Sequence, residues 1–271
     1  MKELRALKKK FGYDFLIKLG KKMVSFLYFI GGLSNLAGQS FYWLFRAPLK
    51  KERVIEQMKK AGYDSFPIVS LVALFIGIIL ALQTAYQMQR LGSEMYIASI
   101  VALSLVRELG PVITSLVVAG RVGAAITAEL GSMQVTEQVD ALETLATNPI
   151  NYLVVPRLLA LALMLPVLTL YADIIGIFGG YLICVYKLGI SSSMYIHITF
   201  DSLLFKDLFT GLIKTVFFGM IIAWVGSYEG FNVQGGAEGV GRSTMRAVVT
   251  TFILIIAADS FFTAMFYFIF P

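Results

Sequence analysis

The sequence of 271 residues is poor in charged residues and has almost no cysteine or histidine. Charged side chains make up 15% of it, whereas soluble domains average about 25%. Its single cysteine, Cys184, excludes a disulfide framework within the chain. Its single histidine, His197, belongs to no Cys/His cluster that would bind a metal. These shortages exclude an ordinary soluble domain, a disulfide-stabilised scaffold and a metal centre.

Motifs for chemistry are also missing. No Gly-Lys pair is followed by Ser or Thr, so the chain has no Walker A loop. No nucleophile–base spacing surrounds His197, which falls in a predicted loop. A cleavable signal peptide is not expected, because the basic N-terminus continues for about 22 residues before an apolar run begins. We therefore expect a chain that is not an enzyme and carries no cofactor of its own.

What the chain has instead is long apolar runs, and 58% of its residues are hydrophobic. Each run is long enough to cross roughly 30 Å of hydrocarbon as a helix. The sequence predicts an all-α, polytopic membrane protein, with an N-terminal region (1–65) and one transmembrane domain (66–271). The five predicted spans are 66–88, a segment within 97–131 that Gly110-Pro111 breaks, 155–186, 208–228 and 247–270.

Basic residues are concentrated at the N-terminus, where residues 1–60 hold 14 of the 23 Lys and Arg. Residues 1–22 mix bases with apolar residues, as an interfacial amphipathic helix does. The apolar run 23–45 has basic clusters on both sides, and a full span would place one cluster on the wrong side of the membrane. We expect 23–45 to be an elbow that dips into the inner leaflet and returns, with a true span as the alternative. The N-terminus is then cytoplasmic.

An acidic stretch, "SMQVTEQVDALETLATNPINY" (132–152), lies between the second and third spans, on the cytoplasmic side. It predicts a short helix over 135–147 that Thr136 caps and Asn148-Pro149 ends. One face carries Val135, Val139, Leu142 and Leu145, and the other carries Glu137, Asp140 and Thr144. The helix is either a solvated connector or a docking helix for a cytoplasmic partner.

Charged residues inside the predicted spans are costly and therefore candidate functional residues. They are Arg107, Glu108, Arg121, Glu129, Asp173, Lys214 and Asp259. Glu108 and Lys214 lie at similar depths, which predicts an ion pair, and the neighbouring Arg107 needs a partner on another helix. We expect Arg121 and Glu129 to hold the base of the bundle. Asp173 and Asp259 are expected to form buried hydrogen bonds between helices.

Two further patterns concern packing. Small residues gather on span two (Gly120, Gly123) and span three (Gly176, Gly179, Gly180), which favours close helix contact. On span one, a stripe of apolar and amide side chains approaches the outer surface. Its members are Leu80, Gln83, Gln87 and Leu91. This stripe is either packed core or the lining of a lipid cavity.

The block "RELGPVITSLVVAGRVGAAITAELGSMQVTEQVDALETLATNPINYLVVPR" (107–157) resembles the signature region of the MlaE/YrbE permease family. "FIGIILALQ" (75–83), "GLIKTVFFG" (211–219) and "GVGRSTMRAVV" (239–249) are similar to it too. The resemblance covers roughly residues 55–270. In that family, the TEQxDAL segment resembles a coupling helix that contacts an ATPase. The resemblance therefore assigns ATPase contact to the matching residues here, which are Thr136, Glu137, Gln138, Asp140, Ala141 and Leu142.

The resemblance implies the permease subunit of an ATP-driven ABC transporter in the bacterial inner membrane. It implies a homodimer with two ATPase subunits, which bind the ATP and Mg, and an optional STAS-domain accessory protein. On the periplasmic side it implies an MCE-domain oligomer. Phospholipid or a related lipid would move between the inner membrane and this oligomer, and this transport would contribute to outer-membrane lipid asymmetry. The alternative is an ion-coupled secondary transporter of a hydrophobic substrate, although the inverted repeats typical of that class are not visible.

Overall fold

The computed structural model describes residues 2–46 and 50–269, and every regular element within these ranges is a helix. The first half comprises α1 (Lys2–Arg46), α2 (Lys51–Ala61), η1 (Tyr63–Ser65), α3 (Phe66–Arg90), η2 (Glu94–Tyr96), α4 (Ile97–Ser104), η3 (Leu105–Leu109), α5 (Gly110–Val118), η4 (Ala119–Gly123) and α6 (Ala124–Val135). The second half comprises α7 (Gln138–Thr144), η5 (Ile150–Val154), α8 (Val155–Tyr186), α9 (Ser192–Ser202), α10 (Phe205–Phe231) and α11 (Gly236–Ile269).

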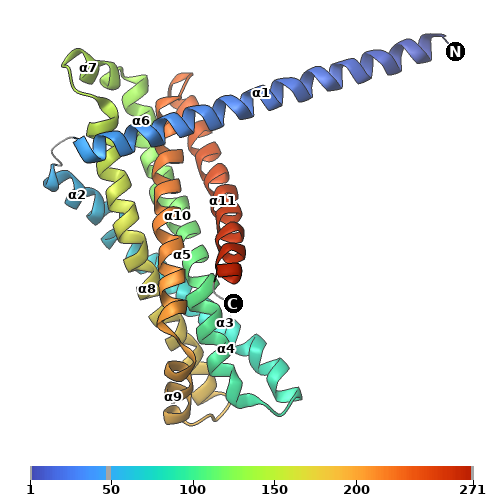
Figure 1. The fold of residues 1–271 in the computed structure, drawn as a ribbon, viewed down its shortest axis with the longest axis vertical. Helices are drawn as coiled ribbons and strands as arrows, with labels where there is room; N and C mark the ends of the chain where they lie inside the picture. The colour runs from blue at the N-terminus through green and yellow to red at the C-terminus, as the bar shows by residue number, and fades with distance from the viewer. Residues whose placement is uncertain (1, 47–49, 270–271) are drawn as a thin grey trace.

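Within the described chain, five helical segments are long and apolar enough to cross a membrane, which confirms the predicted number of spans. They are Lys51–Arg90, Glu94–Val135, Ile150–Tyr186, Phe205–Phe231 and Gly236–Phe268. α7 lies at one end of the bundle and α9 at the other (Figure 1). We call these the α7 end and the α9 end.

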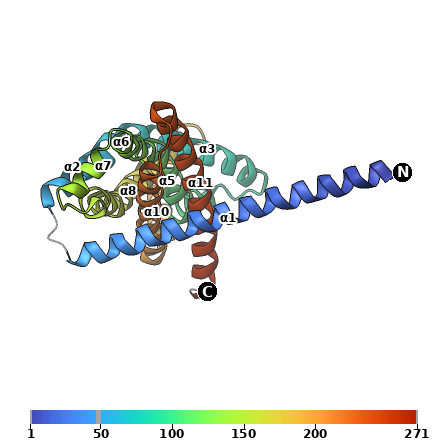
Figure 2. The same cartoon turned by 90° about the horizontal axis from the view of Figure 1, so that it is seen from above.

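The N-terminal helix α1 is a single helix of 45 residues, so the predicted dip and return within 23–45 is wrong. It is not one of the five spanning segments, and it lies across the bundle near the α7 end, with its N-terminal half projecting beyond α11 (Figures 1 and 2). A return inside the lipid would break backbone hydrogen bonds that a straight helix keeps. No proline occurs between residues 23 and 45 to favour such a break.

One face of α1 packs on α10. Phe29 meets the ring of Tyr228 edge-on at 5.2 Å, and Phe41 meets Trp224 at 5.5 Å. Leu36 lies buried between these two contacts. The other faces of α1 remain apolar and exposed, as at Phe45, which is 84% exposed. Exposed apolar side chains of this kind between residues 23 and 45 suit contact with lipid better than contact with water.

The second span continues through Gly110-Pro111, so the predicted break is wrong. Proline removes a backbone donor and its ring crowds the carbonyl four residues earlier. The π turn η3, which ends at Leu109, inserts an extra residue directly before this pair, and Pro111 enters α5 in its first turn. A second π turn, η4, follows at Ala119–Gly123. Both turns let the helix absorb local strain without interruption.

The helix in the acidic stretch is shorter than predicted: α7 spans seven residues, Gln138–Thr144. Thr136 does not cap it, because its hydroxyl donates to the carbonyl of Ser132 in α6, at 2.9 Å. Glu137 then turns the chain with a left-handed backbone, at φ 58°. Ala146, also at φ 58°, ends α7, because its N–H and that of Thr147 close onto carbonyls of the helix.

Asn148 therefore serves the next helix rather than ending α7. Its side-chain oxygen accepts from the backbone N–H groups of Ile150 and Asn151, at 2.9 and 3.2 Å. This is the bonding of an N-cap, and it starts the third span.

The predicted apolar face of this helix is only half correct. Val139 is buried and Leu142 packs against the main core, but Val135 and Leu145 are exposed. The turn at Glu137 and the early end of α7 take these two residues out of its helical register.

Spans α3 and α8 pack closely through small residues. A Cβ added to Gly77 would collide with the carbonyl of Gly176, so the two backbones touch where neither residue has a side chain. Gly179 lies against the carbonyl of Leu74 in the same way. The close contact expected of the small residues on span three is therefore present, and packing accounts for it.

Candidate functional site

A charged network joins three spans near the α9 end. Lys214 of α10 is 2% exposed, and its Nζ lies 2.7 Å from Glu108 Oε2 and 3.0 Å from Asp259 Oδ1. It also donates to Thr263 Oγ1 at 2.7 Å and to the carbonyl of Arg107 at 3.3 Å. The Thr263 hydroxyl in turn donates to Glu108, at 3.0 Å to Oε1. The predicted Glu108–Lys214 pair is thus present, with Asp259 and Thr263 as further members.

Local backbone features position these side chains. Glu108 lies in the π turn η3, which rotates the following residues relative to a regular helix. Gly211 of α10 rests directly on the carbonyl of Val106, where any Cβ would collide. Lys214 lies one turn further along α10 and so reaches the same π turn. The close approach at Gly211 is what brings the ammonium to the carboxylate.

The network is open on one side. The side chain of Glu108 is 40% exposed and that of Asp259 is 19% exposed, although both lie within spans. α11 has the least buried of the five spanning windows, at 11%. One ammonium faces two carboxylates, so negative charge is in excess when both are ionised. Exposed charge at this depth is costly against lipid, so water or another protein must cover this side.

Arg107 finds its partner outside the network. Its Nε lies 3.4 Å from Asp207 Oδ1, at the start of α10. Asp207 also accepts from the backbone N–H of Leu204, which caps α10. Asp207 was not predicted from the sequence, because it lies in the flank before the predicted span. Its place in the first turn of a helix was the signal that could have identified it.

Two clusters at the α7 end contain the other predicted charges. Arg121 donates to Ser65 Oγ at 2.7 Å and to the carbonyl of Lys60 at 3.2 Å, and it lies 3.8 Å from Asp64. These contacts tie the second span to the junction of α2 and α3.

Glu129 lies 2.8 Å from Arg157, which is 3% exposed. Arg157 also donates to the carbonyl of Leu153 at 2.7 Å, so the pair joins α6 to α8. The two predicted residues hold adjacent helices together, as expected for the base of the bundle. Arg157, the buried partner, was not singled out from the sequence.

The two remaining aspartates differ from each other. Asp259 bonds across helices to Lys214, as expected, although as an ion pair. Asp173 was expected to form a buried hydrogen bond, and this is wrong: neither of its oxygens has a partner among the described residues. The carboxyl lies against Gly110, where a Cβ would collide with Oδ1.

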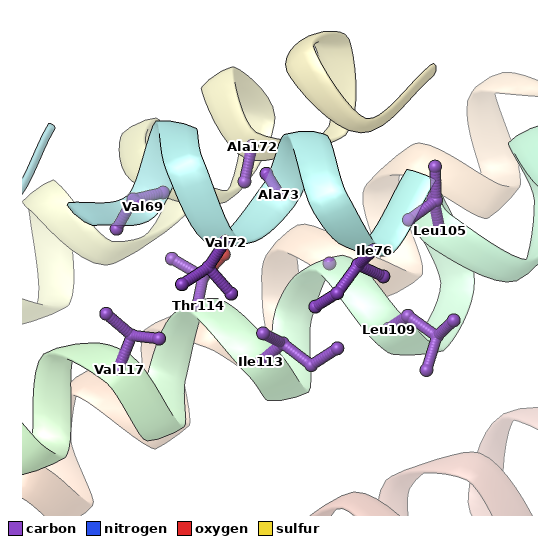
Figure 3. Close-up of a pocket in the computed structure, with 11 residues that line it drawn as sticks. Val69, Val72, Ala73, Ile76, Leu105, Leu109, Ile113, Thr114, Val117 and Ala172 are labelled. Atoms are coloured by element: carbon purple, nitrogen blue, oxygen red, sulfur yellow. The ribbon is translucent and has the colours of Figure 1, made fainter. Parts of the chain in front are cut away.

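The stripe on span one is not part of the lining of any of the four pockets found among the described residues. Leu80 packs against the core, while Gln83, Gln87 and Leu91 are exposed. The nearby crevice between α3 and α5, shown in Figure 3, is lined by apolar side chains such as Val72 and Ile113. Its volume is about 10 Å³, room for at most one water molecule, so it is packed core. A lipid cavity on this stripe would need a second chain to close it.

The residues that the resemblance assigns to ATPase contact are mostly exposed. Gln138, Asp140 and Ala141 are exposed on α7, and Thr136 and Glu137 are exposed in the turn before it. Leu142 faces the core and anchors the helix. Five of the six side chains that the resemblance assigns to ATPase contact are therefore accessible, and the sixth, Leu142, packs in the core.

The chain was compared with known proteins. The profile of the family described as Permease MlaE matches residues 54–265. The chain belongs to the MlaE permease family. It is 44% identical over 249 residues to a probable ABC transporter permease protein of Rickettsia felis, covering 92% of this chain and 96% of the relative. It is 34% identical over 259 residues to the intermembrane phospholipid transport system permease protein MlaE of Haemophilus influenzae, covering 93% and 97%.

The chain is also similar to a plant protein. The chloroplastic protein TRIGALACTOSYLDIACYLGLYCEROL 1 of Arabidopsis thaliana is 37% identical over 232 residues, covering 86% of this chain and 66% of the relative. As an MlaE-family permease with five apolar spans, the chain is a multi-pass membrane protein and a transporter subunit rather than an enzyme.

Proposed function

We propose that this permease is the transmembrane subunit of an ATP-driven transporter that moves phospholipid or a related lipid between the bacterial inner membrane and a periplasmic MCE-domain partner. The observation that carries the proposal is the match to the Haemophilus influenzae phospholipid transport permease along 93% of the chain. Outer-membrane lipid asymmetry is the process that such transport would serve.

The geometry supports an external source of energy. The chain has no Walker A loop, so another subunit must bind the nucleotide and its Mg²⁺. α7 offers an exposed acidic surface at one end of the bundle (Figure 1). With the N-terminus in the cytoplasm, this end faces the ATPase. A STAS-domain accessory protein is an optional further subunit.

The open side of the charged network supports a homodimer. Asp259 and Thr263 lie on α11, Glu108 contacts Thr263, and no other described helix covers the outer face of α11. A second copy placed there would enclose these polar groups in a shared cavity, which lipid headgroups and water can enter. The exposed amides Gln83 and Gln87 would contribute to the same kind of cavity if span one also faces the second copy.

Reconstitution tests the proposal directly. The chain is co-expressed with its genomic neighbours, and the purified complex is placed in vesicles that carry fluorescent phospholipid. ATP is expected to drive exchange of the lipid with the isolated MCE-domain protein, and a non-hydrolysable ATP analogue is expected not to. Failure of ATP to change lipid transfer in a complex that hydrolyses ATP would contradict the proposal.

The alternative, an ion-coupled secondary transporter, has one observation in its favour. A buried lysine held by two carboxylates is the kind of group that proton-coupled transporters use. In the same vesicles, this alternative predicts lipid movement that follows a pH gradient without ATP. Collapse of the gradient with an ionophore therefore separates the two mechanisms.

A further inference from the structure

A polar pocket of about 220 Å³ lies between the junction of α2 and α3 and the second span, at the α7 end. Three apolar side chains of the second span line it, together with five polar side chains, Gln57, Lys60, Asp64, Arg121 and Glu129. The side chains of the four charged residues are between 37% and 49% exposed, so each can be reached from outside the chain. The size and the accessible polar groups suit a small charged ligand.

The two bases of this pocket can still bind an anion. Arg121 uses Nη1 for Ser65 Oγ and for the carbonyl of Lys60, which leaves its Nε and Nη2 without a hydrogen bond among the described residues. Lys60 pairs with Glu56 at 3.0 Å, but both side chains are about half exposed, and such pairs on a helix surface contribute little. Guanidinium and ammonium groups with free N–H donors are the usual partners of a phosphate.

The two acids of this pocket can bind a cation in the same way. Asp64 lies 3.8 Å from Arg121, beyond hydrogen-bond distance, and accepts no hydrogen bond among the described residues. Glu129 bonds to Arg157 through Oε2, at 2.8 Å, and its Oε1 has no partner in the same part of the chain. Two bases and two acids match a ligand that carries one charge of each sign.

An apolar surface continues from the pocket along α3. Asp64 lies directly before α3, and three apolar residues follow it on the same helix face, at i+4, i+7 and i+11: Ile68, Leu71 and Phe75. These three side chains are each about half exposed. The face is roughly 16 Å long, about the hydrocarbon thickness of one membrane leaflet. A lipid whose chains lie on this face would have its head at the pocket.

We propose that the pocket binds the phosphoethanolamine head of a phospholipid in the leaflet at the α7 end, and that the hydrocarbon chains lie on the exposed face of α3. The phosphate accepts from Arg121 and Lys60, and the ammonium donates to Asp64 and Glu129. A trimethylammonium head has the same charge but no N–H to donate, so it binds more weakly. A glycerol head has no cation, so it leaves both acids facing an anion.

This site is separate from the Glu108–Lys214–Asp259 network, because none of those three residues lines the pocket. Lipid binding here is measured without ATP, an ATPase or an MCE-domain protein. A failure of this binding can therefore be distinguished from a failure of the proposed transport.

Three phospholipids with the same chains and different heads test the proposal. Dioleoyl phosphatidylethanolamine, phosphatidylcholine and phosphatidylglycerol are each added to the delipidated full chain in detergent, and native mass spectrometry measures the bound lipid. We expect the ethanolamine lipid to bind about fivefold more tightly than the choline lipid, the factor that one net hydrogen bond makes. The glycerol lipid is expected to bind no better than the choline lipid. Soluble O-phosphoethanolamine, which has the head without the chains, is expected not to displace the ethanolamine lipid.

Variants locate the site. Asp64→Asn is expected to lose most of the preference for ethanolamine over choline, because the neutral amide no longer attracts the ammonium. Lys60→Gln is expected to weaken all three lipids alike, because it removes a contact to the phosphate that they share. Glu52→Gln and Lys59→Gln make the same changes of charge at exposed positions of α2 outside the pocket, and both are expected to behave as the unmodified chain.

Equal binding of the ethanolamine and choline lipids by the unmodified chain would overturn the proposal, and this comparison needs no variant to fold. An unchanged preference in Asp64→Asn would also overturn it, because the ammonium would then bind elsewhere. Stronger binding of the glycerol lipid than of the ethanolamine lipid would overturn it in favour of a site for anionic lipid. Displacement of the ethanolamine lipid by O-phosphoethanolamine at equal concentration would overturn the assignment to a lipid and indicate a soluble ligand.

Discussion

At the residue scale, Lys214 has the most demanding position in the chain. Its ammonium is buried and bonds to two carboxylates and a hydroxyl from two other helices. Lys214→Met leaves Glu108 and Asp259 facing each other without a cation. Removing one partner of a fully buried ion pair costs about 3–5 kcal/mol, and less where water reaches. We expect a lower midpoint of thermal unfolding and a loss of transport, and a smaller loss for Glu108→Gln, because Glu108 is partly exposed.

A charge swap tests the pairing itself. Glu108→Lys with Lys214→Glu is expected to recover part of what either reversal loses, because opposite charges again face each other. The recovery remains incomplete, since the new glutamate at position 214 lies beside Asp259. Adding Asp259→Asn removes that repulsion and should recover more. Strictly additive losses across the series, measured as transport activity and unfolding midpoint, would show that these residues do not interact.

The sequence predicted some of these contacts and missed others for a physical reason. Glu108 and Lys214 could be paired because helix geometry converts residue number into depth. Asp207 and Arg157 could not be assigned as partners, since rotation of one helix about its axis relative to another is set by side-chain packing. Asp173 was expected to be hydrogen-bonded because most buried polar groups are. Asp173 lacks a hydrogen-bond partner because its carboxyl packs against Gly110, and only the folded chain reveals this contact.

At the scale of elements, α7 is the segment whose function is easiest to isolate. Glu137 and Asp140 are exposed, and no base lies between Arg121 and Arg157. Reversing both to Lys is expected to abolish co-purification of the ATPase, because the acidic surface becomes basic. The chain should still insert and dimerise, since neither side chain packs in the core. Glu94→Lys with Asp201→Lys makes the same change of charge at the α9 end and serves as the control. Undiminished recovery of ATPase with the α7 double variant would refute docking on this surface.

The course of α1 gives a second prediction at this scale. Cysteines replacing Arg5 and Ile55, in a Cys184→Ser background, should both be labelled only from the cytoplasm, because both positions lie in basic clusters, which favour the cytoplasmic side of the membrane. Ile55 is 64% exposed, so a cysteine there is accessible. A cysteine replacing Met95, which is exposed at the α9 end, should be labelled only from the periplasm. Periplasmic labelling of position 55 would mean that α1 crosses the membrane.

Helices were predictable from the sequence where their apolar composition alone determines them. They were less predictable where packing against neighbouring helices determines the backbone path. The five spans follow from apolar length. Their ends agree with the structure to within a few residues, except that the first segment begins at Lys51 rather than 66 and α11 begins at Gly236 rather than 247. Apolar length could not distinguish an elbow from a straight interfacial helix, since the two differ only in backbone path. Gly110-Pro111 predicted a break because π turns leave no clear signature in the sequence.

At the scale of the whole molecule, the single chain leaves one span uncovered. The most apolar window of α11 is 11% buried, whereas the other four windows are between 28% and 61% buried. Lipid alone could cover an apolar helix, but the exposed part of α11 includes the polar residues Ser260 and Thr263. Polar side chains at this depth favour a protein partner or an enclosed cavity over lipid tails. α11 is therefore the surface on which a second copy is most strongly expected.

Disulfide cross-linking in native membranes tests this arrangement. Single cysteines along the exposed face of α11, replacing Val249, Ile253, Ile256 and Ser260, are introduced into a Cys184→Ser background. At least one is expected to form a dimer on oxidation, because positions close to the twofold axis of a symmetric pair meet their own copies. Val167→Cys is the control: it is 51% exposed on α8, on the far side of α10 from α11 (Figure 1), and is expected to remain monomeric. Absence of dimer at all four positions, or equal dimer at position 167, would place the contact between copies elsewhere and leave the charged network open to another partner.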